Sequence, residues 1–99
     1  MVVQTLKEVI VCHSKDNVAT AKVMIRKGTL VELPGKKEIE AREEIPFAHK
    51  IALRRIPRGS GVIKYGERIG RATRAIEPGE LVHIHNVRGE RGKGEKGEC

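Results

Sequence analysis

A short pattern, Ile-x-x-Gly-x-x-Val, occurs three times in this 99-residue chain and constrains its fold more than any other feature. The copies begin at Ile25, Ile56 and Ile76. The pattern is typical of a strand that ends in an apolar residue, a turn whose glycine can adopt a positive φ, and the apolar start of the next strand. Because the copies are spaced unevenly, by 31 and then 20 residues, they indicate a reused turn rather than a solenoid with a fixed period.

The rest of the apolar pattern predicts a mostly β fold with one short α-helix. Asp16 is in the position of a helix N-cap, and the apolar spacing predicts a helix over residues 17–26 that ends at Gly28. The highly charged segment Lys36–Glu44 is compatible with either a strand or an exposed loop. Apolar segments bounded by glycine or proline predict strands at Leu6–Val11, Leu30–Leu33, Lys50–Ile56, Val62–Tyr65, Ile69–Ile76 and Leu81–His85.

The length predicts one domain with one core, since a chain of this size buries only about 65% of the surface that its unfolded form exposes. With one Phe, one Tyr and no Trp, the core must consist of aliphatic side chains. The apolar pattern ends near Arg88, and the glycine-rich, charged residues 89–99 are expected to form a flexible tail. We therefore expect a folded domain over residues 1–88 followed by this tail.

The net charge of +7 is concentrated in one segment. Between Lys50 and Arg74 there are eight basic residues and one acidic residue, Glu67. This indicates an anionic partner, namely a carboxylate substrate, an acidic protein surface or a phosphate backbone, with a solvated cationic face as the plain alternative. A nucleic acid is the least favoured partner, because the chain lacks aromatic side chains for base stacking and its tail is nearly neutral.

The cysteine and hydropathy patterns predict the compartment. Cys12 and Cys99 lie near opposite ends of the sequence and form neither a disulfide framework nor a metal-binding spacing. No apolar run approaches the ~18 residues that a membrane span needs, and no secretory signal is present. We therefore expect a cytoplasmic protein in a reducing compartment, without a membrane partner.

The last predicted strand ends in three polar side chains, His83, His85 and Asn86. On a strand, His83 and His85 would share one face, while Val82 and Ile84 would face the other way and fill the core. Two histidines at this spacing can reach one metal ion or hydrogen-bond a substrate, and the alternative interpretation is an ordinary polar strand face.

Further candidate residues lie at the ends of other predicted elements. His13 and His49 are both at such edges, where functional groups tend to collect. Lys64, Tyr65 and Gly66 combine a cation, a phenol and a turn glycine, a set suited to carboxylate recognition and proton transfer. The alternative for this set is a hairpin whose aromatic side chain packs in the core.

Four segments are similar to motifs of one known family. They are H-S-K-D-N-V-A from His13, A-H-K-I-A-L from Ala48, V-I-K-Y-G-E-R-I-G-R-A from Val62 and G-E-L-V-H-I-H-N-V-R from Gly79. In this order they resemble the N-terminal SAF domain of altronate and galactarate dehydratases, over most of the chain. The resemblance implies a β-clip-like fold, which is small, bent and mostly β with one short helix.

The resemblance also implies a reaction class. Family members remove water from a sugar acid by β-elimination, assisted by a divalent metal such as iron or manganese, and their SAF domain precedes a much larger domain that holds most of the active site. That domain is missing here, so we expect a small subunit that is inactive alone and works with a large dehydratase subunit on a small anionic hydroxy acid. Alternatives are the small subunit of a sulfolactate sulfo-lyase, which eliminates sulfite from a similar acid, and a non-catalytic module that binds a carbohydrate or a partner.

These arguments together give the predicted site. The expected substrate-binding residues are His49, Lys50, Lys64, Tyr65, His83, His85 and Asn86. Candidate metal ligands in the assembled enzyme are His83, His85 and His13. No nucleic acid is expected to bind, self-association into a homo-oligomer is left open, and no residue is assigned as the catalytic acid or base.

Overall fold

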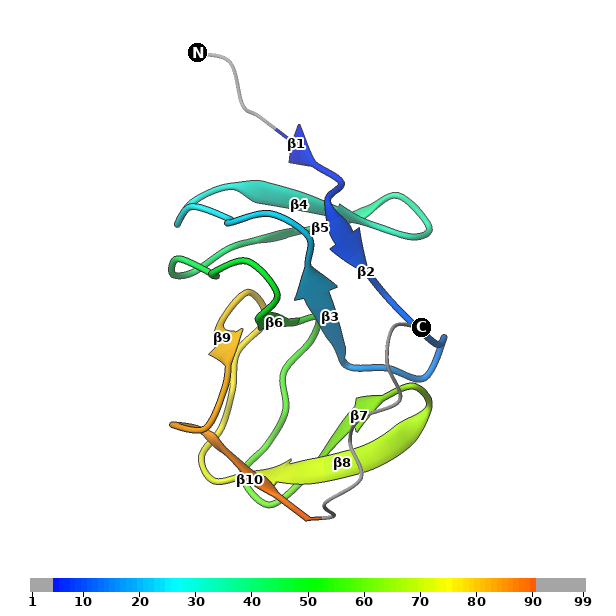
Figure 1. The fold of residues 1–99 in the computed structure, drawn as a ribbon, viewed down its shortest axis with the longest axis vertical. Coiled ribbons are helices and arrows are strands. Elements are labelled where there is room, and N and C mark those ends of the chain that lie inside the picture. Colours follow the sequence, from blue (N-terminus) through cyan, green and yellow to red (C-terminus); the bar gives the residue numbers. More distant parts are fainter. Residues whose placement is uncertain (1–4, 91–99) are drawn as a thin grey trace.

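The computed structural model describes residues 5–90, in which ten short β-strands form three small sheets (Figure 1). This part of the chain contains no α-helix, and so none long and apolar enough to cross a membrane. The mostly β prediction is confirmed, and residues 91–99 of the predicted tail lie outside the described residues. The strands are β1 (Thr5–Leu6), β2 (Val9–Ile10), β3 (Val18–Ala21), β4 (Leu30–Leu33), β5 (Lys37–Glu40), β6 (Lys50–Ala52), β7 (Gly61–Lys64), β8 (Glu67–Ala72), β9 (Leu81–Val82) and β10 (Val87–Gly89).

The three sheets follow one another along the long axis of the molecule. The first has the order β1-β4-β5, with β1 parallel to β4. The second has the order β2-β3-β6-β9 and the third β10-β8-β7, and both are antiparallel throughout. In Figure 1 the four-stranded sheet lies between the other two, so that β3 and β6 connect the two ends of the molecule.

Residues 21–51 and 52–82 repeat one structural unit with an offset of 31 residues. Each unit contains an antiparallel bridge between two isoleucines, Ile25 with Ile45 in the first and Ile56 with Ile76 in the second. Each unit also contains a two-stranded antiparallel ribbon, β4–β5 or β7–β8. The buried positions correspond in pairs: Ala21 with Ala52, Ile25 with Ile56, Val31 with Val62, Ala41 with Ala72, Ile45 with Ile76, and Ile51 with Val82.

The turn that the sequence pattern identifies three times occurs four times in the structure. The additional copy begins at Ile45 and has Ala48 in the glycine position, with a positive φ of 70°. Gly79 is its equivalent in the second unit, with φ 90°, and a Cβ atom there would overlap the carbonyl oxygen of Glu40. The second unit therefore requires glycine at this turn, whereas the first tolerates alanine, and that difference hides the duplication from a glycine-based search.

Each unit has its own aliphatic core, and β3 separates the two. Val18 and Ala19 are adjacent on β3 and fully buried, but they belong to opposite clusters because successive side chains on a strand face opposite sides. The first core contains Ala19, Ala21, Ile25, Val31, Ala41, Ile45 and Ile51. The second contains Val18, Ala52, Ile56, Val62, Ala72, Ile76 and Val82.

The predicted helix over residues 17–26 is wrong. Residues 18–21 form β3, which pairs with β2 on one edge and with β6 on the other. Asp16, expected to cap the helix, accepts hydrogen bonds from backbone groups that are mostly distant in sequence. Strand pairing on both edges satisfies the backbone hydrogen bonds of this segment, and a short isolated helix has little stability of its own to compete with it.

The strand predictions have mixed outcomes. Leu30–Leu33 is confirmed as β4, and the charged segment Lys36–Glu44 proves to contain the strand β5. The predicted single strand Leu6–Val11 is instead divided, because β1 ends at Leu6 and pairs in the first sheet, whereas β2 belongs to the second. At the other end of the domain, β10 extends through Gly89, one residue beyond the predicted boundary.

Candidate substrate-binding site

The segment that carries the polar cluster forms a turn rather than the end of a strand. β9 ends at Val82, and His83, Ile84 and His85 follow in the turn that leads to β10. The expectation that the two histidines share a strand face, with Ile84 in the core behind them, is therefore wrong. The Ile84 residue is 83% exposed, which makes it the most exposed large apolar residue among those described.

Asn86 explains why the strand ends at this point. The residue is fully buried, its Oδ1 accepts a hydrogen bond from the backbone N–H of His83 at 2.9 Å, and its Nδ2 donates one to the carbonyl of Leu81 at 2.8 Å. These bonds satisfy backbone groups that a longer strand would have paired. Both polar atoms of the Asn86 side chain are therefore used in hydrogen bonds that hold the turn.

The turn brings His83 against His49, which is distant in the sequence. The centroids of the two imidazole rings are 4.7 Å apart, and the ring planes are inclined at 52°. His49 directly follows the turn at Ala48 and precedes β6, and its Nδ1 lies 3.0 Å from the carbonyl oxygen of Phe47. Two of the predicted site histidines therefore meet because β6 and β9 are neighbouring strands.

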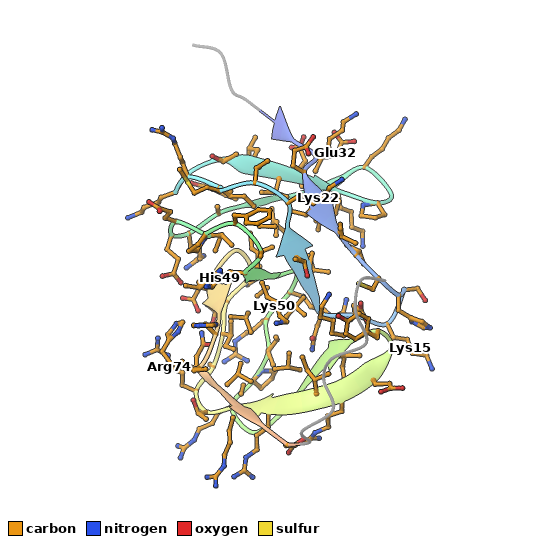
Figure 2. All side chains as sticks on the ribbon, viewed as in Figure 1. Lys15, Lys22, Glu32, His49, Lys50 and Arg74 are labelled. Carbon is orange, nitrogen blue, oxygen red and sulfur yellow. The ribbon has the colours of Figure 1, made fainter. Side chains whose placement is uncertain are left out.

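Lys50 is the next residue along β6 and lies opposite Val82 in the β6–β9 register. In the view of Figure 2, Lys50 lies between the middle sheet and the ribbon of β7 and β8. It borders an open pocket of about 270 Å³, whose lining residues are Lys50, Val62, Ile69, Val82, His83, Ile84, Val87 and Gly89. The pocket combines an apolar floor with a cationic amine and an imidazole at its rim, the usual composition of a site for a small polar ligand.

The electrostatic interactions connect this pocket to Lys64. Desolvation lowers the pKa of His83, and the charges of His49, His85 and Lys50 lower it further. Burial lowers the pKa of Lys64, the charge of Lys50 adds to this effect, and the charge of Asp16 opposes it. Lys50 therefore acts on both groups, and a bound anion would relieve the repulsion among them.

Lys64 is the buried cation of the site, with only 6% of its surface exposed. Its Nζ lies 3.2 Å from Cys12 Sγ, to which it donates a hydrogen bond, and 4.5 Å from the centroid of the Tyr65 ring. Cys12 is the one cysteine among the described residues, since Cys99 lies outside them.

Asp16 holds the adjacent turn and was not among the predicted site residues. Its buried carboxylate accepts backbone hydrogen bonds from His13, Tyr65 and Gly66. The His13 ring lies against Gly66, where a Cβ atom would approach the ring to 2.9 Å. The motif that begins at His13 contains an Asp-Asn pair directly before a strand, and this pair is the signal that could have indicated a long-range clamp.

The predicted site residues are thus brought together in part. Lys50 and His83 line one pocket, and the His49 ring contacts His83. The charge of Lys50 acts on Lys64, and Tyr65 lies beside Lys64. His85 is exposed and acts on His83 through its charge. His13 belongs to the turn at Gly66, and Asn86 is buried.

The donor set of the described residues does not form a complete metal site. Within residues 5–90, no three His, Cys, Asp or Glu side chains gather closely enough to hold a metal ion. The His49–His83 pair offers two imidazoles, but Lys50 places a positive charge beside them, which opposes the binding of a divalent cation.

Comparison with known proteins places the chain in a family. The family described as the altronate/galactarate dehydratase SAF domain matches residues 7–90. Altronate dehydratase of Bacillus subtilis (strain 168) is 39% identical over 83 residues, which cover 84% of this chain and 16% of that enzyme. Galactarate dehydratase (L-threo-forming) of Escherichia coli (strain K12) is 39% identical over 70 residues, 71% of this chain and 13% of the enzyme.

A second group of relatives is shorter. The alpha subunit of (2R)-sulfolactate sulfo-lyase from Chromohalobacter salexigens is 43% identical over 54 residues, which cover 54% of this chain and 57% of that subunit. The chain therefore spans about a sixth of the length of the altronate dehydratases that it matches, but more than half of this alpha subunit. With its match over nearly all the described residues, the chain belongs to the SAF-domain family of altronate and galactarate dehydratases.

Proposed function

We propose that this chain is the SAF component of a lyase that eliminates water from a sugar acid or a related hydroxy acid, and that it binds the substrate carboxylate. The observation that carries the proposal, beyond family membership, is that Lys50 borders the pocket beside His83 and acts electrostatically on the buried Lys64. Lys50 and His83 at one small pocket, with the buried Lys64 interacting electrostatically with Lys50, favour a carboxylate over a neutral sugar.

The residues have distinct proposed roles. Lys50 and His83 contact the carboxylate directly, His49 orients His83, and Lys64 supplies positive charge from beneath the site with Tyr65 beside it. His85 adjusts the charge of His83 from the surface, and Asn86 keeps the turn in shape. The groups that remove the α-proton and assist departure of the β-hydroxyl are assigned to a large partner chain or domain.

The partner is also assigned the ligands of a divalent metal such as iron or manganese. The described residues lack a group of three donors, and the neighbouring amine of Lys50 disfavours a cation. The proposal therefore includes no step in which this chain acts through a metal.

The second candidate is the alpha subunit of a sulfo-lyase that acts on (2R)-sulfolactate. It is favoured by length, because the chain covers 57% and 79% of two such alpha subunits but only 16% and 15% of two altronate dehydratases. Sulfolactate carries both a carboxylate and a sulfonate, so it would suit a pocket with two cationic groups at least as well as a sugar acid does.

The test is reconstitution. The chain is purified with its partner from the native source, the partner is identified by mass spectrometry, and turnover is measured on altronate, galactarate and sulfolactate. We expect the isolated chain to be inactive, and Lys50→Ala in the complex to raise the KM about tenfold or more, as expected for loss of a charge-assisted contact. The control is Lys22→Ala, which removes an exposed amine from another edge of the molecule (Figure 2). Full turnover by the chain alone, or equal kinetics for the two variants, would contradict the proposal.

A further inference from the structure

Asp16 is an ionisable residue that is almost completely buried, with 1% of its surface exposed. Its Oδ1 accepts a hydrogen bond from the backbone N–H of Gly66 at 2.8 Å, and its Oδ2 accepts two more, from His13 at 3.1 Å and Tyr65 at 3.2 Å. Burying a carboxylate is unfavourable unless such charge-assisted bonds replace its water. Two of the three donors come from a turn about 50 residues away.

The neighbouring residue Asn17 and the backbone of Asp16 extend the same contact. The side chain of Asn17 accepts a hydrogen bond from the Ile63 N–H at 2.8 Å and donates one to the Gly61 carbonyl at 3.0 Å. The backbone carbonyl of Asp16 accepts a hydrogen bond from Arg54 Nη2 at 3.2 Å. The loop before β3 is therefore fixed against β7 and its turn, which leaves the Asp16 carboxylate little freedom to move.

The turn held by Asp16 is the one that presents Lys64. Tyr65 has a positive φ of 60°, a conformation that costs a non-glycine residue about 1–2 kcal/mol, and its N–H bond to Asp16 helps to maintain it. In this conformation the Tyr65 ring lies beside the Lys64 amine. Asp16 also acts on Lys64 through its negative charge, which opposes the effects of burial and of Lys50 on the Lys64 pKa.

We propose that Asp16 is a positioning residue for the candidate site: its hydrogen bonds to the N–H groups of Tyr65 and Gly66 fix the Lys64–Gly66 turn and with it the position of the Lys64 amine against the Tyr65 ring. The inference deepens the proposed function and rests on it for the identity of the ligand, whereas the interaction between Asp16 and Lys64 is testable without any ligand.

The first experiment uses Asp16→Asn in the full chain, with Lys64 selectively resolved by ¹³C NMR of its ε-carbon. We expect the Lys64 titration to move to lower pH, and the amide protons of Tyr65 and Gly66 to exchange faster. Glu44→Gln is the control, because it removes the same charge from an exposed position in the other unit and should leave Lys64 unchanged. A folded Asp16→Asn variant with an unaltered Lys64 titration overturns the proposal.

The second experiment leaves Asp16 in place, so that it remains decisive where Asp16→Asn does not fold. In Lys64→Met, the amide protons of Tyr65 and Gly66 should keep their slow exchange, because their hydrogen bonds to Asp16 remain. Fast exchange of both amides in this folded variant means that Lys64 rather than Asp16 fixes the turn, which also overturns the proposal. Both readouts are independent of turnover, so an inactive complex would contradict the proposed function while leaving this inference intact.

Discussion

Asn86 and His85 are adjacent in the sequence but play different parts in the structure. Nothing in the alternation of residues 80–89 distinguishes a buried turn amide from an exposed imidazole, because the distinction depends on where β9 stops. That point is set by hydrogen bonds from the Asn86 side chain to the backbone of Leu81 and His83. Side-chain bonds to nearby backbone are a known competitor of strand pairing, so the extended prediction fails for a local physical reason.

His83 gives a prediction about pH. Its pKa is lowered, first by desolvation and then by the charges of His49, His85 and Lys50, so the folded chain binds this proton at lower pH than the unfolded chain, where histidine titrates near about 6.5. The contribution of His83 to stability is therefore complete above the unfolded pKa and is lost as the pH falls from there through the lower folded pKa.

We expect the Tm of the native chain to fall more steeply than that of His83→Gln between about pH 7.5 and about pH 5.5. Thermal unfolding followed by circular dichroism across this range measures the difference. A hydroxy acid bound beside His83 would stabilise its protonated form, so the same ligand should reduce the difference. Parallel Tm curves for the two proteins would show that the neighbouring cations do not act on His83 in the folded state.

At the scale of the elements, the duplication gives a matched pair of positions. Ala48 and Gly79 occupy equivalent turns with φ values of 70° and 90°, but only a Cβ atom at Gly79 would overlap a carbonyl oxygen, that of Glu40. We expect Gly79→Ala to lower the free energy of unfolding by about 2 kcal/mol or more, since it combines overlap with an unfavourable φ.

The reverse change at the equivalent turn should act in the opposite direction. Ala48→Gly relieves the left-handed conformation, which outweighs the added entropy of the unfolded chain and stabilises the protein by up to about 1 kcal/mol. Guanidinium chloride unfolding of both variants measures the two effects. Equal destabilisation by both substitutions would mean that the two units are not conformationally equivalent at this turn.

The elements also show how far the sequence could predict the fold. The glycine turns located the starts of β4, β7 and β9, because a positive φ next to an apolar residue has few alternatives. The helix at residues 17–26 failed because a cap residue and periodic apolar positions are local signals, whereas β3 is stabilised by partners that precede and follow it. Alanine in place of glycine at residue 48 concealed the fourth turn and with it the duplication.

The candidate site was predictable to a similar degree. His49, Lys50 and His83 were identified by chemistry and position, and they do meet. The contact arises because β6 pairs with β9, a register that the sequence pattern did not specify. Asp16 could not be identified as part of the site, because its role depends on a turn about 50 residues away.

At the scale of the whole molecule, the structure separates basic residues that the sequence analysis treated alike. Arg54 donates hydrogen bonds to the carbonyls of Lys15 and Asp16, and Arg55 forms an ion pair with Glu77 at 3.2 Å. Further along the basic segment, Arg68 forms an ion pair with Glu90 at 2.6 Å. Among the described arginines from Arg54 onward, four side chains make no hydrogen bond or ion pair with other described residues: Arg58, Arg71, Arg74 and Arg88.

Two of these four lie directly opposite each other. Arg71 on β8 and Arg88 on β10 are register partners, and like charges in this relation repel. An acidic surface on the partner would relieve that repulsion and would also increase the rate of association through long-range attraction. We therefore expect the β8–β10 face to contribute to docking of the large partner.

Reversing both charges, with Arg71→Glu and Arg88→Glu together, should lower the association rate constant about tenfold at low ionic strength. The loss should shrink as the salt concentration rises, since screening weakens the attraction in the native pair as well. Surface plasmon resonance with the co-purified partner measures both quantities. The control is Arg55→Glu with Arg58→Glu, which changes the net charge equally outside the β8–β10 ribbon. If both double variants slow association equally, total charge rather than this face governs docking; if neither does, the arginines form only a solvated surface.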